Sequence, residues 1–89
     1  MTNVAHDQIK HQFFIDLDKD NAHLDYELIN NDIVNFTHTY VPFRQRGKGH
    51  AEALVEAGLL WAKQQGLQIE TSCWYVEKFL ANQDTKLKK

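Results

Sequence analysis

The sequence has little of several residue types on which whole fold classes depend. Its 89 residues include one Cys and one Pro. A single Cys cannot form an internal disulfide, which excludes a disulfide-stapled scaffold. No apolar run reaches the roughly 18 residues of a transmembrane helix, and residues 1–12 lack the apolar stretch of a secretory signal. We therefore expect one soluble, monomeric domain in the cytoplasm, without a membrane partner.

Basic side chains are too few for a typical nucleic-acid-binding surface. The formal net charge is -2, and acidic residues dominate residues 1–43 while basic residues dominate residues 44–89. The densest basic cluster is Arg44, Arg46 and Lys48. Nucleic-acid domains usually carry a wider basic stripe with interleaved aromatic residues. The compact cluster suits one small anionic group better, and we expect no nucleic-acid partner.

The first half of the chain is patterned like strands. Apolar residues alternate with polar ones over residues 13–18 and 24–28, and a third segment, about 34–41, is rich in β-branched and aromatic residues. Pro42 ends this segment because it has no amide hydrogen for a sheet ladder. The pattern predicts an antiparallel three-stranded meander, in which Phe36, His38 and Tyr40 share one face.

The second half changes to a helical period. Apolar residues between 48 and 65 recur at helical spacing, residues 67–71 resemble a short strand, and a second helix is expected over about 73–81. The predicted order is β-β-β-α-β-α, an α/β (α+β) fold. Its predicted organisation is a flexible N-terminus (1–11), a single domain (12–82) and a polar tail (83–89).

The connection between the third strand and the first helix is rich in Gly and cations. Gly47 and Gly49 would let the backbone approach an anion, and the first amides of a helix have no internal partner. The segment does not match a Walker A loop, and Glu52 stands where G-x-G-x-x-G needs its third glycine. Spacing alone leaves an anion site and an ordinary glycine-bearing connection equally open.

The pattern R-x-x-G-x-G, formed by Arg44, Gly47 and Gly49, resembles the acetyl-CoA motif of the GNAT (GCN5-related N-acetyltransferase) superfamily. The longer run from His38 to Val55, followed by C-x-Y-V at residues 73–76, resembles the small single-domain YjdJ-type GNAT proteins. The resemblance covers about residues 12–81. It implies a minimal GNAT-like fold with acetyl-CoA as the acyl donor and no metal.

The same resemblance implies where acetyl-CoA would lie. Loop amides would hold the CoA diphosphate, and the pantetheine would lie in a gap between the strand at 34–41 and the strand at 67–72. The implied binding residues are Thr39, Val41, Arg44, Gln45, Arg46, Gly47, Lys48, Gly49, His50 and Tyr75.

Cys73 is the only thiol in the chain. If Ser72 caps the second helix, Cys73 is the first helical residue, where free amides and the helix dipole lower a thiol pKa. A cysteine here can also be a small buried packing residue. The resemblance, which implies an acyl-transfer role for a Cys at this position, favours the catalytic interpretation.

His38 lies on the third predicted strand, where GNAT enzymes often place a general base. A catalytic base and a cross-strand packing histidine remain equally open interpretations. We expect His6, His11 and His23 to be solvated.

One acidic pattern imitates a calcium site. Asp16, Asp18 and Asp20, with Glu27 at the twelfth position, match the spacing of an EF-hand loop. Both flanks alternate like strands, whereas an EF-hand needs helices, so we expect a solvated hairpin.

The leading hypothesis is an acetyl-CoA-dependent acyltransferase, an N-acetyltransferase acting on an unidentified amine or thiol of a small molecule or protein. The alternative is an acyl-CoA-binding module without turnover, because so short a chain leaves little protein for an acceptor pocket. A nucleic-acid or protein adaptor that uses the basic cluster is the weakest hypothesis.

Overall fold

The structure, a computed structural model, describes residues 3–17 and 20–87. Its elements are, in chain order, β1 (Ala5–Asp7), β2 (Gln12–Asp16), β3 (Asn21–Ile29), β4 (Ile33–Tyr40), the 3-10 turn η1 (Phe43–Gln45), α1 (His50–Gln64), β5 (Gln68–Thr71) and α2 (Trp74–Leu87). The strands form one five-stranded sheet in sequence order. Strands β1 to β4 pair antiparallel, and β5 pairs with β4 in parallel. The predicted α/β (α+β) class is confirmed.

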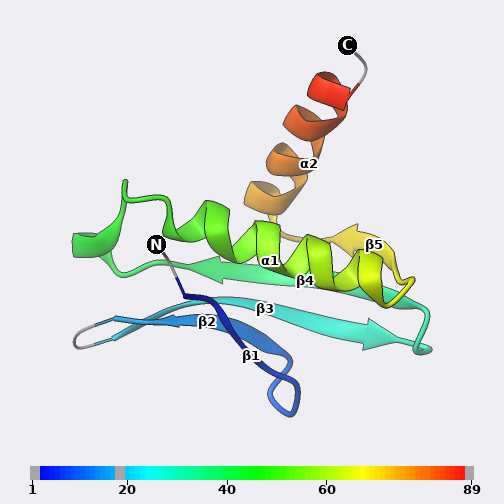
Figure 1. Ribbon diagram of the computed structural model, residues 1–89, viewed down its shortest axis with the longest axis horizontal. Coiled ribbons are helices and arrows are strands. Elements are labelled where there is room, and N and C mark those ends of the chain that lie inside the picture. Colours follow the sequence, from blue (N-terminus) through cyan, green and yellow to red (C-terminus); the bar gives the residue numbers. More distant parts are fainter. Residues whose placement is uncertain (1–2, 18–19, 88–89) are drawn as a thin grey trace.

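Helix α1 lies across one face of the sheet and encloses the core, and α2 leaves the sheet on the same side (Figure 1). The predicted helical stripe is correct, because Leu54, Val55 and Leu59 are buried. Helical periodicity missed Gly58, which is also buried. A Cβ at Gly58 would lie 2.9 Å from Cε1 of Phe36 and 3.0 Å from Cδ2 of Leu24. The missing side chain therefore sets how closely α1 approaches the sheet.

The N-terminal segment contains a strand that the sequence analysis missed, so the meander has four strands where three were predicted. Strand β1 pairs with β2, and the ring of His6 stacks on Phe13 with 4.0 Å between ring centroids. His6 Nε2 also lies 2.6 Å from the hydroxyl of Tyr26. The sequence pattern did not predict this strand because the segment is polar. The imidazole of His6 makes the packing contacts that an apolar side chain would usually make.

The expectation that His6 and His11 are solvated was wrong. Burial lowers the pKa of His6, an effect that the nearby Asp7 opposes and His11 reinforces. The ring of His11 stacks on Tyr26, with 5.1 Å between centroids. Both imidazoles serve as aromatic packing groups at the β1–β2 end of the sheet.

An irregularity in the β3–β4 ladder changes which residues of β4 share a face. Tyr26 pairs with Phe36, but Asp25 pairs with His38, so Thr37 is an extra residue on β4. The extra residue reverses the alternation, and Thr39 rather than His38 follows Phe36 on the α1 side. The prediction that Phe36, His38 and Tyr40 share one face was therefore wrong. We call the sheet face opposite α1 the open face.

The acidic pattern at residues 16–27 forms a hairpin, as predicted. Asp16 ends β2 and Glu27 lies within β3, so strands flank the turn in place of the helices of an EF-hand. Asp18 lies outside the described residues. Within residues 3–17 and 20–87, no group of three or more His, Cys, Asp or Glu is placed to hold a metal ion.

Helix α2 is longer than predicted and extends past Ala81 to Leu87. Residues 88 and 89 of the predicted polar tail lie outside the described residues. In the part of the chain that the structure covers, neither helix combines the length and the apolar character needed to cross a membrane.

Candidate functional site

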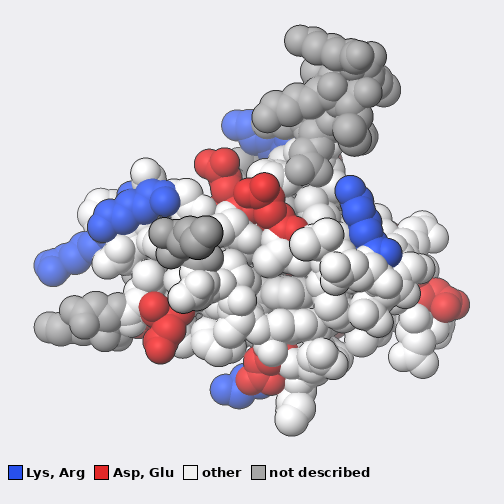
Figure 2. All heavy atoms as spheres, viewed as in Figure 1, with Lys and Arg blue, Asp and Glu red and all other residues white. Residues whose placement is uncertain are grey.

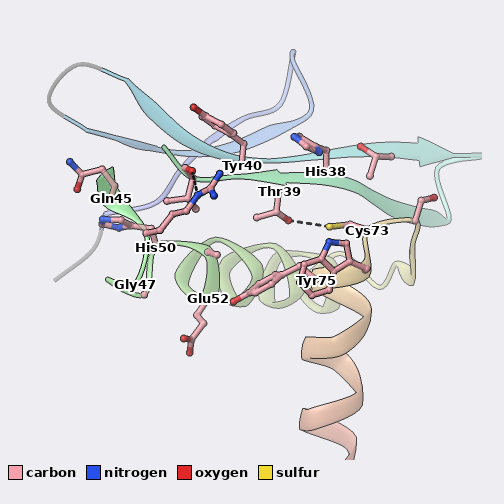
Figure 3. A pocket seen from close by; sticks show the side chains of 16 residues that line it. His38, Thr39, Tyr40, Gln45, Gly47, His50, Glu52, Cys73 and Tyr75 are labelled. Atoms are coloured by element: carbon pink, nitrogen blue, oxygen red, sulfur yellow. Dashed lines mark hydrogen bonds between the residues drawn. The ribbon is translucent and has the colours of Figure 1, made fainter. Parts of the chain in front are cut away.

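A groove of about 740 Å³ lies where β4 and β5 separate. The two strands pair only as far as Phe36 and Thr71. Beyond that point, residues 37–41 of the chain form one wall of the groove, and residues 72–75 form the opposite wall. The connection from η1 to α1 closes one end (Figure 3). The gap expected from the sequence is therefore a real cavity in the fold.

The end of the groove at α1 is built from backbone. Gly47 and Gly49 both line the groove and have positive φ angles of 81° and 84°. Gly49 is also the N-cap of α1, and no side chain caps this helix end. The first amides of α1 therefore remain available, and a helix N-terminus attracts anions.

His50 is the first residue of α1 and also lines the groove. Its Nδ1 is buried and has no hydrogen-bond partner among the described residues. Buried polar atoms are nearly always hydrogen-bonded. This nitrogen is therefore an unsatisfied polar atom beside the helix N-terminus, enclosed by the protein.

The basic residues of the loop do not all face the groove. Lys and Arg side chains gather over the η1 end of the molecule (Figure 2). Arg46 lines the groove, and its Nε donates to the carbonyl of Val41 at 3.0 Å. Lys48 Nζ donates to Gln45 Oε1 at 3.3 Å. Arg44 lines a second cavity, of about 600 Å³, on the side of Asp20 and Tyr40.

The predicted CoA-binding residues therefore fall into two groups. Neither Arg44 nor Lys48 lines the groove, although the sequence placed both with the anion site. The others do line it: Thr39, Val41, Gln45, Arg46, Gly47, Gly49, His50 and Tyr75.

Cys73 lies across the groove from β4, with its sulfur 3.5 Å from Oγ1 of Thr39 (Figure 3). Helix α2 begins at Trp74, one residue later than predicted, so Cys73 itself occupies the cap position. Its backbone amide donates to Thr71 Oγ1 at 2.9 Å. The predicted cap, Ser72, instead hydrogen-bonds to Asn35, 3.1 Å away.

The surroundings of the Cys73 thiol favour its ionised form. Burial alone would raise the pKa of Cys73, but hydrogen bonds from the Thr39 side chain and from the backbone amides of Val76, Tyr75 and Thr39 outweigh it. The net result is a pKa below the ordinary thiol value. A sulfur that accepts helix-terminal amides is a stronger nucleophile near neutral pH than an ordinary thiol.

Alkylation of Cys73 by iodoacetamide is therefore expected to rise with pH around a midpoint below the ordinary thiol pKa of about 8.5. A lower pKa means that the thiolate is already present at pH values where a free thiol is protonated. Replacing Thr39 with Val removes one hydrogen bond to the sulfur, so the midpoint should move to higher pH. Mass spectrometry of the alkylated protein measures both midpoints.

Thr37→Val is the matched control, because the Thr37 hydroxyl donates to the carbonyl of Asp25 and not to the sulfur. Its midpoint should equal that of the wild type. An unchanged midpoint in Thr39→Val would contradict the role given to the Thr39 hydroxyl.

His38 does not point at the thiol. Its side chain is exposed and lies on the open face, while Thr39 next to it points toward Cys73 (Figure 3). The backbone of β4 thus separates the two predicted catalytic side chains. The extra residue at Thr37 produces this arrangement, and period-two patterning could not reveal it.

Several groove residues escaped the sequence analysis. They are Thr37, Tyr40, Ala51, Glu52, Ser72 and Trp74. Trp74 is 72% exposed at the mouth of the groove. Burial raises the pKa of Tyr75, and the charge of Glu52 raises it further, so these two groove residues lie near each other. For the wall formed by residues 72–75, the only indication in the sequence was that Ser72 and Trp74 are neighbours of Cys73.

Comparisons with known proteins agree on one family for this chain. A profile of the GCN5-related N-acetyl-transferase family matches residues 12–88. Protein NATD1 of Bos taurus is 38% identical over 79 residues, which cover 86% of this chain and 70% of that protein. Protein NATD1 of Danio rerio is 35% identical over 79 residues, covering 86% of this chain and 72% of that protein.

The fold also has a solved counterpart. The solution structure of a GCN5-like protein from Staphylococcus aureus superposes with a TM-score of 0.68 and is 24% identical in sequence. The match covers 94% of this chain and 82% of that one. At this identity the likeness establishes the shared fold.

Proposed function

Because this chain belongs to the GCN5-related N-acetyl-transferase family, we propose that it transfers an acetyl group from acetyl-CoA to an amine or thiol acceptor. One observation carries the proposal. A single groove joins a free helix N-terminus, suited to the CoA diphosphate, to a polarised thiol at its other end. That combination matches the two ends of an acetyl-CoA molecule, an anionic one and a thioester.

The anionic end would be held mainly by the backbone. The amides at the start of α1, together with Gly47 and Gly49, would receive the diphosphate. Arg46 at the same end would add positive charge. Arg44, which lines the other cavity, would contribute through long-range attraction only.

At the other end, the Cys73 thiolate would attack the thioester carbonyl. A bond forms between the sulfur and the acyl carbon, the bond to the CoA sulfur breaks, and CoA leaves as a thiolate that takes up a proton. The acceptor would then remove the acetyl group from Cys73. The hydroxyl of Thr39, 3.5 Å from the sulfur, would stabilise the attacking thiolate.

Replacing Gly49 with Ala is expected to weaken acetyl-CoA binding by about 10-fold, or 1.4 kcal/mol. Gly49 lines the groove, and no atom of the described residues lies within 4 Å of an added Cβ, so the methyl would occupy groove space that the proposal assigns to the ligand. Isothermal titration with acetyl-CoA measures the change. Binding without acetyl transfer to a panel of amines and thiols would indicate the non-catalytic acyl-CoA module instead.

Gly66→Ala is a matched control for this variant. Gly66 also has a positive φ, 70°, with open space around an added Cβ, but it lies beyond the far end of α1. Both variants should lose about 1 kcal/mol of stability, because a side chain disfavours left-handed backbone. Only Gly49→Ala should lose affinity for acetyl-CoA. If both variants lost affinity equally, a binding role for the loop would be disproved.

A further inference from the structure

Strand β1 is attached to the core mainly through one side chain. His6 pairs with Phe13, which is buried on the α1 side of the sheet, so the His6 side chain points to that side as well. Ala5 and Asp7, the other two residues of the strand, therefore point to the open face. Val4, which precedes the strand, is only partly buried. The position of β1 thus depends largely on the imidazole of His6.

The ring of His6 packs among three other aromatic rings. It stacks on Phe13, with 4.0 Å between centroids, and meets the ring of Trp61 from α1 edge-on at 4.9 Å. The ring of Tyr26 from β3 lies 5.6 Å away. Among the residues that the structure describes, no carboxylate forms an ion pair with this imidazole. The surroundings of the ring are therefore suited to an uncharged group.

The hydrogen bond between His6 and Tyr26 also suits a neutral imidazole. Nε2 of His6 lies 2.6 Å from the hydroxyl of Tyr26, for which the described part of the chain provides no other partner. The hydroxyl can donate to Nε2 only while this nitrogen keeps its lone pair. A protonated imidazole has none, because both of its nitrogens carry hydrogen. Protonation would therefore leave a buried hydroxyl without an acceptor.

The charged groups near the ring do not compensate for its burial. Burial is the largest effect and lowers the pKa of His6. The carboxylate of Asp7 acts in the opposite direction, and the charge of His11 lowers the pKa further. Tyr26 stays neutral, because burial and the charge of Asp7 raise the pKa of its hydroxyl. The residues that contact the ring from β2 and α1 are the uncharged aromatic side chains described above.

His23 on the open face has a contrasting environment. It was expected to be solvated, but its side chain is only 26% exposed, and its Nδ1 lies 3.0 Å from Oδ1 of Asp25. A proton on His23 would meet a carboxylate, whereas a proton on His6 would meet aromatic rings. Of these two imidazoles, His6 is the one that loses favourable contacts when it is protonated.

We propose that protonation of His6 releases β1 from the sheet, so that β1 is docked in neutral solution and detaches in mildly acidic solution. Detachment would uncover Phe13 and Trp61 and leave β2 as the edge of the sheet. An unpaired strand edge is a place where another strand can add. Because β1 and β5 lie at opposite margins of the sheet, the transition is separate from the groove and independent of the proposed acetyl transfer.

The direction of the pH effect follows from the linkage between protonation and docking. In released β1 the imidazole has its ordinary pKa of about 6.5, and in docked β1 the pKa of His6 is lower. Docking is therefore at full strength well above pH 6.5, weakens as the pH falls below this value, and stops weakening below the pKa of the docked ring. Between about pH 7.5 and 5.5, a proton that binds the released state alone raises the release equilibrium about 10-fold.

The test is hydrogen–deuterium exchange of the whole protein, followed by NMR at about pH 7.5 and 5.5, with each rate divided by the intrinsic exchange rate at that pH. We expect the amides that pair β1 with β2, within residues 5–7 and 12–14, to lose about 10-fold in protection at the lower pH. Amides of the β3–β4 ladder should keep their protection. The ring signals of His6 should titrate with a midpoint below about 6.5.

Two variants assign the effect to one imidazole. His6→Phe keeps an aromatic ring between Phe13 and Trp61 but cannot be protonated, so its protection should be equal at the two pH values. His11→Asn is the matched control, because it removes the other imidazole that stacks on Tyr26. Asn tolerates the positive φ of 55° at this position. This variant should keep the pH dependence of the wild type.

Four results would overturn the proposal. One is protection of β1 that does not change with pH in the wild type. Another is a loss of protection that the β3–β4 ladder shares, since the whole domain would then be unfolding. The third is a pH dependence that survives in His6→Phe or disappears in His11→Asn. The fourth, which needs no variant, is a His6 ring that titrates at or above about 6.5.

Discussion

The Cys73→Ser variant is expected to lose acetyl transfer by about 100-fold or more while it still binds acetyl-CoA. A serine hydroxyl at neutral pH is almost entirely protonated, whereas the Cys73 pKa lies below the ordinary thiol value. Affinity should persist, because the diphosphate end of the groove is built from the loop around Gly47 and Gly49. Transfer rates and isothermal titration on the same preparation measure the two effects.

Acetylation of the protein itself gives a second measurement. Wild-type protein incubated with acetyl-CoA should gain one acetyl mass that maps to Cys73, and the variant should not. If Cys73 only fills space, the variant should instead lose about 1 kcal/mol or more of stability from a buried, poorly paired hydroxyl. Unchanged transfer in a folded variant would mean that the acceptor attacks acetyl-CoA directly, with His38, which lines the groove, as the candidate base.

The Gly58→Val variant is expected to lose about 2–3 kcal/mol of stability, a large part of the 5–15 kcal/mol typical of a domain. A Cβ at this position would lie 2.9 Å from Phe36 and 3.0 Å from Leu24, both of which are fully buried. Either α1 must move away from the sheet or the two side chains must leave their preferred rotamers. Thermal unfolding followed by circular dichroism should show a midpoint lower by about 10 °C.

Leu60→Val is the control for this variant. Leu60 is 58% exposed on the same helix, so the change introduces the same β-branched residue without a core contact. Its stability should stay within about 0.5 kcal/mol of the wild type. A Gly58→Val protein as stable as this control would show that the interface between α1 and the sheet can adjust freely.

The elements with clear periodicity were predictable from the sequence. Alternation located the hairpin of β2 and β3, and helical spacing identified the buried stripe of α1. Strand β1 was not predictable in this way, because its contacts with Phe13 and Tyr26 come from an imidazole. The burial of Gly58 was not predictable either. The helical pattern is read from apolar side chains, and Gly58 is buried because it has no side chain.

The site was predictable where the backbone forms it. Gly47 and Gly49 revealed the loop, and the position of Cys73 after a short strand indicated the far end of the groove. The side chains around that end were not predictable, because one extra residue at Thr37 decides which of them face the thiol. If strict alternation is continued past Thr37, His38 is assigned to the α1 side of the sheet and Thr39 to the open face, which is the reverse of the observed arrangement.

Strand β4 pairs with β5 over only part of its length, so one part of β4 is an interior strand and the other part is a sheet edge. Strand β4 lies inside the five-stranded sheet as far as Phe36, and the described part of the chain places no strand on its far side beyond that residue (Figure 1). In hydrogen–deuterium exchange, amides of residues 33–36 should be protected like those of an interior strand. Amides of residues 37–41 that face away from β3 should exchange like those of a sheet margin. Two backbone groups of this edge are already paired: the Thr39 amide donates to the sulfur of Cys73, and the Val41 carbonyl accepts from Arg46. The others could pair with an amide-bearing ligand as a further strand would, which would slow their exchange only when the groove is filled.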